Sequence, residues 1–339
     1  ILHITSDEDI DVHRTNGEPI PQLILTCPDY VCRNYHELVE TESYPPCYRI
    51  IPSLSIFTIH SWMSALQLER FEQKASQLSE RLKRCNSNWE DAFFITLARN
   101  FGFGLNGDAF ETWANRIPLR AVDKHRDELF QIEAFFFGQA GLLQGTAGDE
   151  YYLRLKKEYE YLSHKFGLTP MDVSQWRFLR LRPTNFPHIR IAQLAVLYHR
   201  SYGLLSRIME AETVTKVHEI LKGGTSAYWV NHYTFEHPSP SRPKTLSNSS
   251  LDLLIINTVA TFLYSYGVHK GKEEYCARAG AFLEELKAEY NYITRMCEQC
   301  GIKAANASDS QALIQLKKEY CDKKKCLYCR IGYEYLKRN

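Results

Sequence analysis

The sequence has almost no excess of charge of one sign and no long apolar run, and its first residues lack the features of a secretory signal. Its 41 Lys and Arg residues stand against 40 Asp and Glu residues, which gives a net charge of +1. This balance excludes a protein that binds nucleic acid through its global charge, although a local basic surface is still compatible with it. The longest apolar run, residues 251–263, is too short and too polar to span a bilayer, so we expect a core helix there and no membrane partner.

Nucleotide-binding motifs are also absent or out of context. No GxxxxGK[ST] phosphate-binding loop occurs in the sequence. Residues 102–107 match the GxGxxG dinucleotide pattern, but the residues before them have the spacing of an amphipathic helix, whereas the dinucleotide site requires a strand. We therefore interpret these glycines as a helix end. A small-molecule site built from the glycine-rich helix ends at 102–107 and 138–145 stays open as one hypothesis.

The residues that are present predict a mainly α-helical fold. Hydrophobic residues make up 44% of the 339 residues, enough for a sizeable core. Residues 1–52 alternate apolar and polar side chains around an Asn16-Gly17 turn, which predicts a β-hairpin with a second strand near residues 22–26. From Ser53 onward the apolar spacing is helical. We expect a helical array with a small N-terminal β-hairpin-containing piece.

The predicted organisation has four segments. The N-terminal β-containing segment covers residues 1–52, and a helical domain follows at 53–236. Residues 237–250 contain three prolines and five serines, which indicates a linker. The C-terminal helices and a cysteine cluster occupy residues 251–339. The chain begins without Met in an alternating segment, so we expect residues before Ile1 in the natural protein.

Ten cysteines are present, and five of them lie between Cys297 and Cys329. Without a secretory signal we expect a cytoplasmic protein whose cysteines are reduced thiols or metal ligands. Two C-x-x-C pairs separated by a helix-length insert are one way to build a tetrahedral thiolate site. The candidate ligands are Cys297, Cys300, Cys321, Cys326 and Cys329.

Two metals fit this pattern, and free thiols are the alternative. Zinc is expected ahead of an iron–sulfur cluster, since nothing in the sequence demands redox chemistry. The C-x4-C-x2-C spacing at 321–329 occurs in plant-type ferredoxins, but there the fourth cysteine follows downstream, and this chain has none. A bound metal would stabilise the C-terminal segment.

A basic and aromatic stretch at residues 176–190 is the candidate contact for phosphate or nucleic acid. Arginine guanidinium groups bind phosphates bidentately, and aromatic faces stack on bases. The stretch has no acidic residue, so its charge is not neutralised locally. The alternative is a connection whose arginines pair with carboxylates of other helices. The candidate residues are Trp176, Arg177, Arg180, Arg182, Phe186 and Arg190.

Four separated motifs, at residues 101–110, 133–143, 182–187 and 320–332, resemble a Bacteroidetes family known as domain of unknown function 2851. The resemblance extends over essentially the whole chain and implies no established activity. Members of that family look longer at the N-terminus, with acidic residues on neighbouring strands that are similar to a PD-(D/E)xK nuclease core. In such a core carboxylates hold Mg²⁺ against a phosphodiester. The resemblance thus implies that residues 1–26 belong to an α/β nuclease-like core whose metal-binding carboxylates this chain lacks.

Two further hypotheses therefore compete with the small-molecule site. One is a protein that binds or processes nucleic acid as part of a nuclease-like protein, with Mg²⁺ required only by a preceding part. The other is a non-enzymatic helical scaffold or interaction protein with a structural metal site. The sequence assigns no catalytic residue, and it does not predict the oligomeric state.

Overall fold

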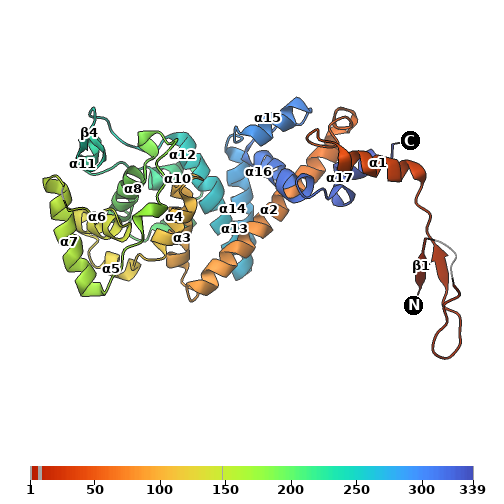
Figure 1. Ribbon diagram of the computed structural model, residues 1–339, viewed down its shortest axis with the longest axis horizontal. Coiled ribbons are helices and arrows are strands. Elements are labelled where there is room, and N and C mark those ends of the chain that lie inside the picture. The colour runs from red at the N-terminus through yellow and green to blue at the C-terminus, as the bar shows by residue number, and fades with distance from the viewer. Residues whose placement is uncertain (1, 7–9, 147, 339) are drawn as a thin grey trace. The chain divides into compact units, whose positions relative to one another are not determined.

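The computed structural model describes residues 2–6, 10–146 and 148–338, and within them the chain is mainly α-helical, as predicted. Helices follow one another along most of the chain, and each of the two small sheets has two strands (Figure 1). The chain divides into two compact units. Unit 1 joins Ile1–Arg70 with Ala288–Asn339, and unit 2 contains Phe71–Lys287. The long helix α2 (Ile56–Arg84) begins in unit 1 and ends in unit 2.

Unit 1 is built from two segments that are far apart in the sequence. Figure 1 shows α1, near the start of the chain, beside α17, near its end, and the two helices are in contact. The elements of unit 1 besides α2 are β1 (His3–Thr5), β2 (Gln22–Ile24), α1 (Asp29–Glu40), the 3₁₀ turn η1 (Ile51–Ser53), α15 (Tyr292–Gln299), α16 (Ala307–Gln315), the π-helical turn η5 (Leu316–Cys321), the 3₁₀ turn η6 (Cys326–Tyr328) and α17 (Arg330–Leu336).

One apolar cluster holds these two segments of unit 1 together. Trp62 and Leu66 lie four residues apart, so they share one face of α2, and both are buried. Leu313 and Ile331 of the later segment and Leu38 of α1 are buried in the same cluster. Fully burying a side chain of this size contributes roughly 1.5–3 kcal/mol, so the cluster accounts for the docking of the two segments.

Unit 2 contains many helices, and local sequence features mark where some of them begin. The Asn88 side chain caps α3 by accepting hydrogen bonds from the backbone amides of Glu90 and Asp91. Pro187 is the first residue of α8. The elements are α3 (Trp89–Phe101), α4 (Gly107–Ala114), α5 (Leu119–Asp123), α6 (Leu129–Gln139), α7 (Glu150–Phe166), η2 (Val173–Gln175), η3 (Pro183–Asn185), α8 (Pro187–Arg200), α9 (Leu204–Glu210), α10 (Val214–Leu221), α11 (Ala227–Val230), β3 (His232–Thr234), β4 (His237–Pro238), α12 (Asn248–Leu254), the π-helical turn η4 (Ile255–Val259), α13 (Ala260–Lys270) and α14 (Glu273–Glu285).

The core of unit 2 is rich in aromatic side chains. Helix α6 is buried nearly all round, and its residues 135–137 are three consecutive phenylalanines with no exposed surface. The Trp113 indole packs edge-on against Phe136 and donates its N–H to the Phe136 carbonyl at 2.9 Å. Such pairs stabilise beyond the area they bury. Helix α6 is therefore the central element of this unit.

The two N-terminal strands do not form the predicted hairpin, because β1 and β2 pair in parallel. The turn at Asn16-Gly17 does form, with an antiparallel bridge between His13 and Pro19. A tight turn sets the register only of the residues beside it, and these strands lie well beyond that bridge. Residues 7–9, also part of the predicted hairpin, lie outside the described residues.

The predicted linker at 237–250 does not separate the two units, since the residues on both sides of it belong to unit 2. Its Lys244 ammonium donates to the backbone carbonyls of Trp229 and Val230 at 2.5 and 2.7 Å. Its Leu246 side chain is buried. Prolines and serines predict that a segment is not helical, but they do not prevent it from packing against the core.

One helical segment, Asn248–Lys270, is long and apolar enough to cross a membrane by length and composition. In unit 2, 67% of its most apolar window is buried, and Phe262 and Leu263 have no exposed surface. The predicted core helix is confirmed.

Candidate functional site

The basic stretch forms a loop, residues 177–182, that we call the arginine loop. Two anchors in unit 2 hold its start. The Trp176 side chain is buried and donates its indole N–H to the Ala140 carbonyl at 2.8 Å. The amide side chain of Asn106 binds both the backbone N–H and the carbonyl of Arg177, each at 2.8 Å. These contacts fix the path of the chain at the start of the loop.

Three of the four candidate arginines lie on the surface. Arg177, Arg180 and Arg182 are exposed, and within the described ranges none of them forms an ion pair with a carboxylate. Arg180 has a φ of 65°, in the left-handed region that residues other than glycine rarely adopt. Leu179 between them is 82% exposed. The arginine loop therefore presents three guanidinium groups to solvent.

Arg190 does not join this surface. Its guanidinium is buried, donates to Asn185 Oδ1 at 2.7 Å and Gln193 Oε1 at 2.9 Å, and lies 4.4 Å from the centre of the Phe103 ring. Burial without a carboxylate partner lowers the pKa of Arg190 to about 10. Its polar and aromatic contacts indicate that it stabilises the start of α8.

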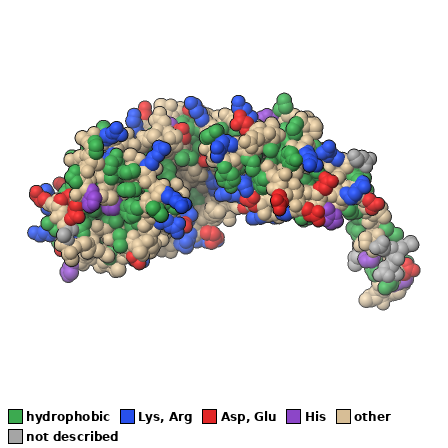
Figure 2. All heavy atoms as spheres, turned by 45° about the horizontal axis from the view of Figure 1, so that its top comes forward, with side chains coloured by type: hydrophobic (Ala, Val, Ile, Leu, Met, Phe, Trp, Pro, Cys, Tyr) green, Lys and Arg blue, Asp and Glu red, His purple; other side chains and the backbone are tan. Residues whose placement is uncertain are grey.

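The candidate stacking residues are also used by the core. Trp176 is buried, and Phe186 is half-buried with its ring against Phe178, at a centroid distance of 5.3 Å. The ring of Trp176 is therefore not available to stack on a base, and the ring of Phe186 is only partly exposed. Over the face of the molecule in Figure 2, basic and acidic side chains are interspersed, as the balanced composition leads one to expect.

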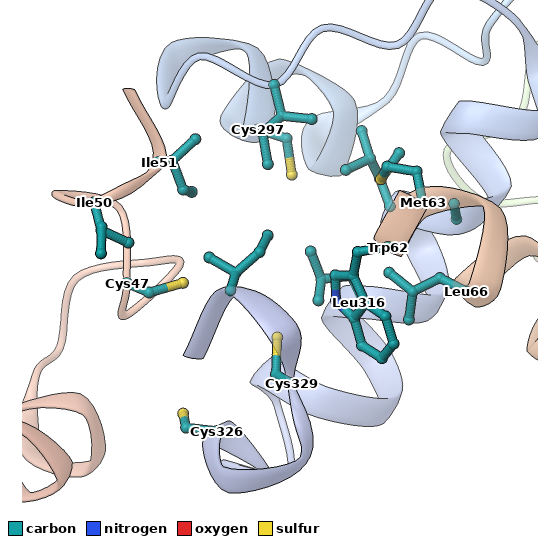
Figure 3. Packing of buried hydrophobic residues seen from close by; sticks show 14 of the residues in the cluster. Cys47, Ile50, Ile51, Trp62, Met63, Leu66, Cys297, Leu316, Cys326 and Cys329 are labelled. Carbon is teal, nitrogen blue, oxygen red and sulfur yellow. The ribbon is translucent and has the colours of Figure 1, made fainter. Parts of the chain in front are cut away.

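The candidate cysteines separate into two groups in unit 1. Cys321, Cys326 and Cys329 line a small cavity together with Cys47, from the loop between α1 and α2. Figure 3 shows the sulfurs of Cys47, Cys326 and Cys329 directed into the same part of the core. The other residues that line this cavity, which we call the cysteine cavity, are Pro46, Tyr320 and Gly332.

The predicted ligands Cys297 and Cys300 do not line the cysteine cavity. Cys297 is buried in the surrounding apolar cluster, and Cys300 packs at its margin. The sequence analysis missed Cys47 because it lies far upstream, with only the preceding Pro45-Pro46 to mark a turn. Nothing in its local sequence indicates a partner among the C-terminal cysteines.

All ten thiols are free, and the buried ones are held in their neutral form. Burial, together with the neighbouring thiols, raises the pKa of Cys47, and burial raises the pKa of Cys321 to about 12. Within the described part of the chain, no group of three or more His, Cys, Asp or Glu side chains is placed to hold a single metal ion.

The match to a family model covers residues 1–292 and carries the description Protein of unknown function (DUF2851). The chain belongs to this family. Searches of the curated proteins and of the solved structures find no match. The family match ends before α16, so three of the four cysteines that line the cysteine cavity lie beyond it, and the family description brings no activity to either site.

Two cavities of unit 2 lie away from both the arginine loop and the glycine-rich helix ends. One, of about 420 Å³, is lined by Glu90, Asp91 and Asp123 together with Arg120 and Arg126. The other, of about 360 Å³, adjoins it and shares Asp91 and Arg120. Neither is lined by residues 102–107 or 138–145, the glycine-rich ends of the small-molecule hypothesis.

Proposed function

We propose that this member of the DUF2851 family binds nucleic acid by contacting the sugar–phosphate backbone with the arginine loop. The observation that carries the proposal is the exposure of Arg177, Arg180 and Arg182 without carboxylate partners among the described residues. An arginine that serves only to stabilise a fold is usually paired or packed, as Arg190 is in this unit. The three exposed guanidinium groups match phosphate oxygens in charge and geometry.

The anchoring of the loop supports the same proposal. Asn106 and Trp176 hold the backbone at the start of the loop. Because a fixed loop loses little conformational entropy on binding, more of the arginine–phosphate energy is available as affinity. The left-handed backbone of Arg180 is a local strain of the kind often found at binding loops.

The expected binding is independent of base sequence. With Trp176 and Phe186 packed into unit 2, the arginine loop offers charge rather than stacking faces. Contacts to phosphate and sugar position a protein on nucleic acid, whereas base contacts select the sequence. We therefore propose that the arginine loop positions nucleic acid for processing by a nuclease-like protein. Only the processing step would require Mg²⁺.

Salt-dependent binding tests the proposal directly. Affinity for single-stranded and duplex oligonucleotides is measured between low and physiological salt, for the natural chain and for the variant Arg177→Gln/Arg180→Gln/Arg182→Gln. Each phosphate contact lowers the slope of log K against log salt by close to one unit, so we expect the triple variant to lose about 2–3 units of slope and roughly 10–100-fold in affinity at low salt.

A matched control removes the same charge elsewhere on unit 2. Arg154, Lys157 and Lys165 are exposed on α7, so the variant with all three changed to Gln tests for a general charge effect. We expect this control to bind like the natural chain. Equal losses in both variants, or no binding by the natural chain at low salt, would overturn the proposal. In that case the scaffold function, which the cysteine cavity favours independently, would be the better proposal.

A further inference from the structure

The cysteine cavity brings four thiols together from two segments that the sequence keeps far apart. Cys47 comes from the loop between α1 and α2, and Cys321, Cys326 and Cys329 come from the region of η5 and η6. Three of the four are buried, and Cys321 is half-buried. Four free cysteines around one small cavity in an apolar core match in number and kind the ligands of a four-thiolate metal centre.

Two buried donors beside this cavity support the same conclusion. The Trp62 indole N–H and the Tyr44 hydroxyl have no hydrogen-bond partner among the described residues, although both atoms are buried. Trp62 lies against the Cys329 thiol, and Tyr44 lies against the Cys321 thiol. Leaving a buried donor unpaired costs about 1–3 kcal/mol, and a thiolate beside it would accept the bond. Donors that point at metal-bound sulfurs are the usual outer contacts of such a centre.

The segment after Cys326 approaches the cavity closely. The backbone amides of Ile331 and Gly332 lie against the Cys329 sulfur. A Cβ atom at Gly332 would come within 2.3 Å of the Cys326 carbonyl oxygen, so only glycine allows the first turn of α17 to sit against the cysteine loop. Backbone N–H groups directed at cysteine sulfurs tune iron–sulfur clusters.

The arrangement of the ligands favours a cluster over a single ion. Structural zinc sites are usually built from two close pairs of ligands, whereas this set has three closely spaced cysteines in C-x4-C-x2-C and one distant cysteine. Zinc would bring its thiolates to about 3.8 Å from one another, given Zn–S bonds near 2.3 Å. Among the described residues, no group of three or more His, Cys, Asp or Glu side chains is placed to hold one ion. A four-iron cluster is larger, and it holds its thiolates farther apart.

We propose that Cys47, Cys321, Cys326 and Cys329 ligate one [4Fe–4S] cluster. This assignment replaces Cys297 and Cys300 of the sequence-based set by Cys47. The cluster joins the loop before α2 to the segment before α17, so it ties the two sequence segments of unit 1 to each other. It rests on the cysteine cavity alone and does not depend on nucleic-acid binding.

The test is metal and sulfide analysis of the full chain purified without oxygen and without added metal. We expect ~4 iron and ~4 acid-labile sulfide per chain and a visible absorption band that reduction bleaches. Cys47→Ser should lose most of the iron, as should Cys329→Ser. Cys297→Ser and Cys300→Ser, which change the two cysteines of the sequence-based set, should retain it.

A second measurement uses the natural chain, so its result does not depend on whether the serine variants fold. The natural chain is alkylated before and after removal of metal, and each cysteine is followed by mass spectrometry. The exposed Cys27 and Cys32 should react at once in both states, whereas the four ligands should become reactive only after removal. Zinc in place of iron, absence of any metal, or iron retained by Cys47→Ser and lost by Cys297→Ser would each overturn the proposal.

Discussion

At the scale of single residues, Glu133 is a carboxyl group buried in the core of unit 2. Its side chain is 1% exposed, and it accepts hydrogen bonds from the Tyr151 hydroxyl at 2.5 Å and the Ser226 hydroxyl at 2.8 Å. Burial, only partly offset by these bonds, raises the pKa of Glu133 to about 7. The carboxyl group is therefore held half-protonated near neutral pH, in the middle of an aromatic core.

This raised pKa predicts a pH-dependent stability. Between pH 4.5 and 7 the folded chain binds more protons at Glu133 than the unfolded chain does, so the free energy of unfolding falls as the pH rises. Glu133→Gln, which cannot ionise, should flatten this fall. The free energy of unfolding of the variant, relative to that of the natural chain, should therefore be roughly 1–3 kcal/mol higher at pH 8 than at pH 5. Urea unfolding at the two pH values measures it. The same pH dependence in the variant and the natural chain would assign the effect to another group.

At the scale of helices, two glycines in helix interiors have opposite surroundings. In α6, a Cβ atom at Gly138 would lie 2.0 Å from the Tyr159 ring, which is itself buried and bonded to Gln139. In α14, a Cβ atom at Gly280 would meet nothing within 4 Å. The first glycine is required by close packing, whereas the second has no packing reason to be there.

The two substitutions to alanine should therefore have opposite signs. Gly138→Ala should destabilise the chain by about 1–3 kcal/mol, because the Tyr159 ring must shift in a packed core. Gly280→Ala should stabilise it by up to about 1 kcal/mol, because alanine is the better helix former. Thermal unfolding of both variants measures the difference. A neutral Gly138→Ala would show that α6 and α7 can separate slightly without cost.

The elements show which features of this chain can be read from the sequence. Local signals, such as the Asn88 cap, the proline that begins α8 and the helical apolar spacing from Ser53 onward, indicate helices correctly, because each depends on residues within one or two turns. The sequence indicates a basic stretch at residues 176–190, but it does not show which of its arginines lack a carboxylate partner in the fold. The parallel pairing of β1 with β2 and the approach of Cys47 to Cys326 could not be predicted, since both depend on contacts between distant residues.

At the scale of the whole molecule, unit 1 depends on contacts between its two segments. The Asn34 side chain of α1 donates to the carbonyls of Tyr335, Leu336 and Arg338 at 2.7–3.3 Å. The Tyr335 hydroxyl donates to Glu37 at 2.7 Å. The cluster we propose adds a further link between the same two segments.

Removal of the metal should therefore loosen unit 1 and leave unit 2 intact. After reduction and chelation, we expect trypsin to cut first among Lys323–Arg330, near the cysteines, and to do so at least several-fold faster than in the untreated chain. Timed digestion followed by mass spectrometry gives the order of cleavage. The Cys47→Ser variant is the control, since chelation should not change its digestion. First cleavage within unit 2 in both states would contradict the prediction.

The division of unit 1 between distant segments has a consequence for how the protein is made. Residues 71–287 leave the ribosome before Ala288 does, so unit 2 can fold while the chain is still being synthesised. During that time Leu38, Ile51 and Trp62 have been made, but the helices that bury them have not. A slow or interrupted translation would expose this apolar surface, and a chaperone that shields it would be most useful in the interval before α16 and α17 emerge.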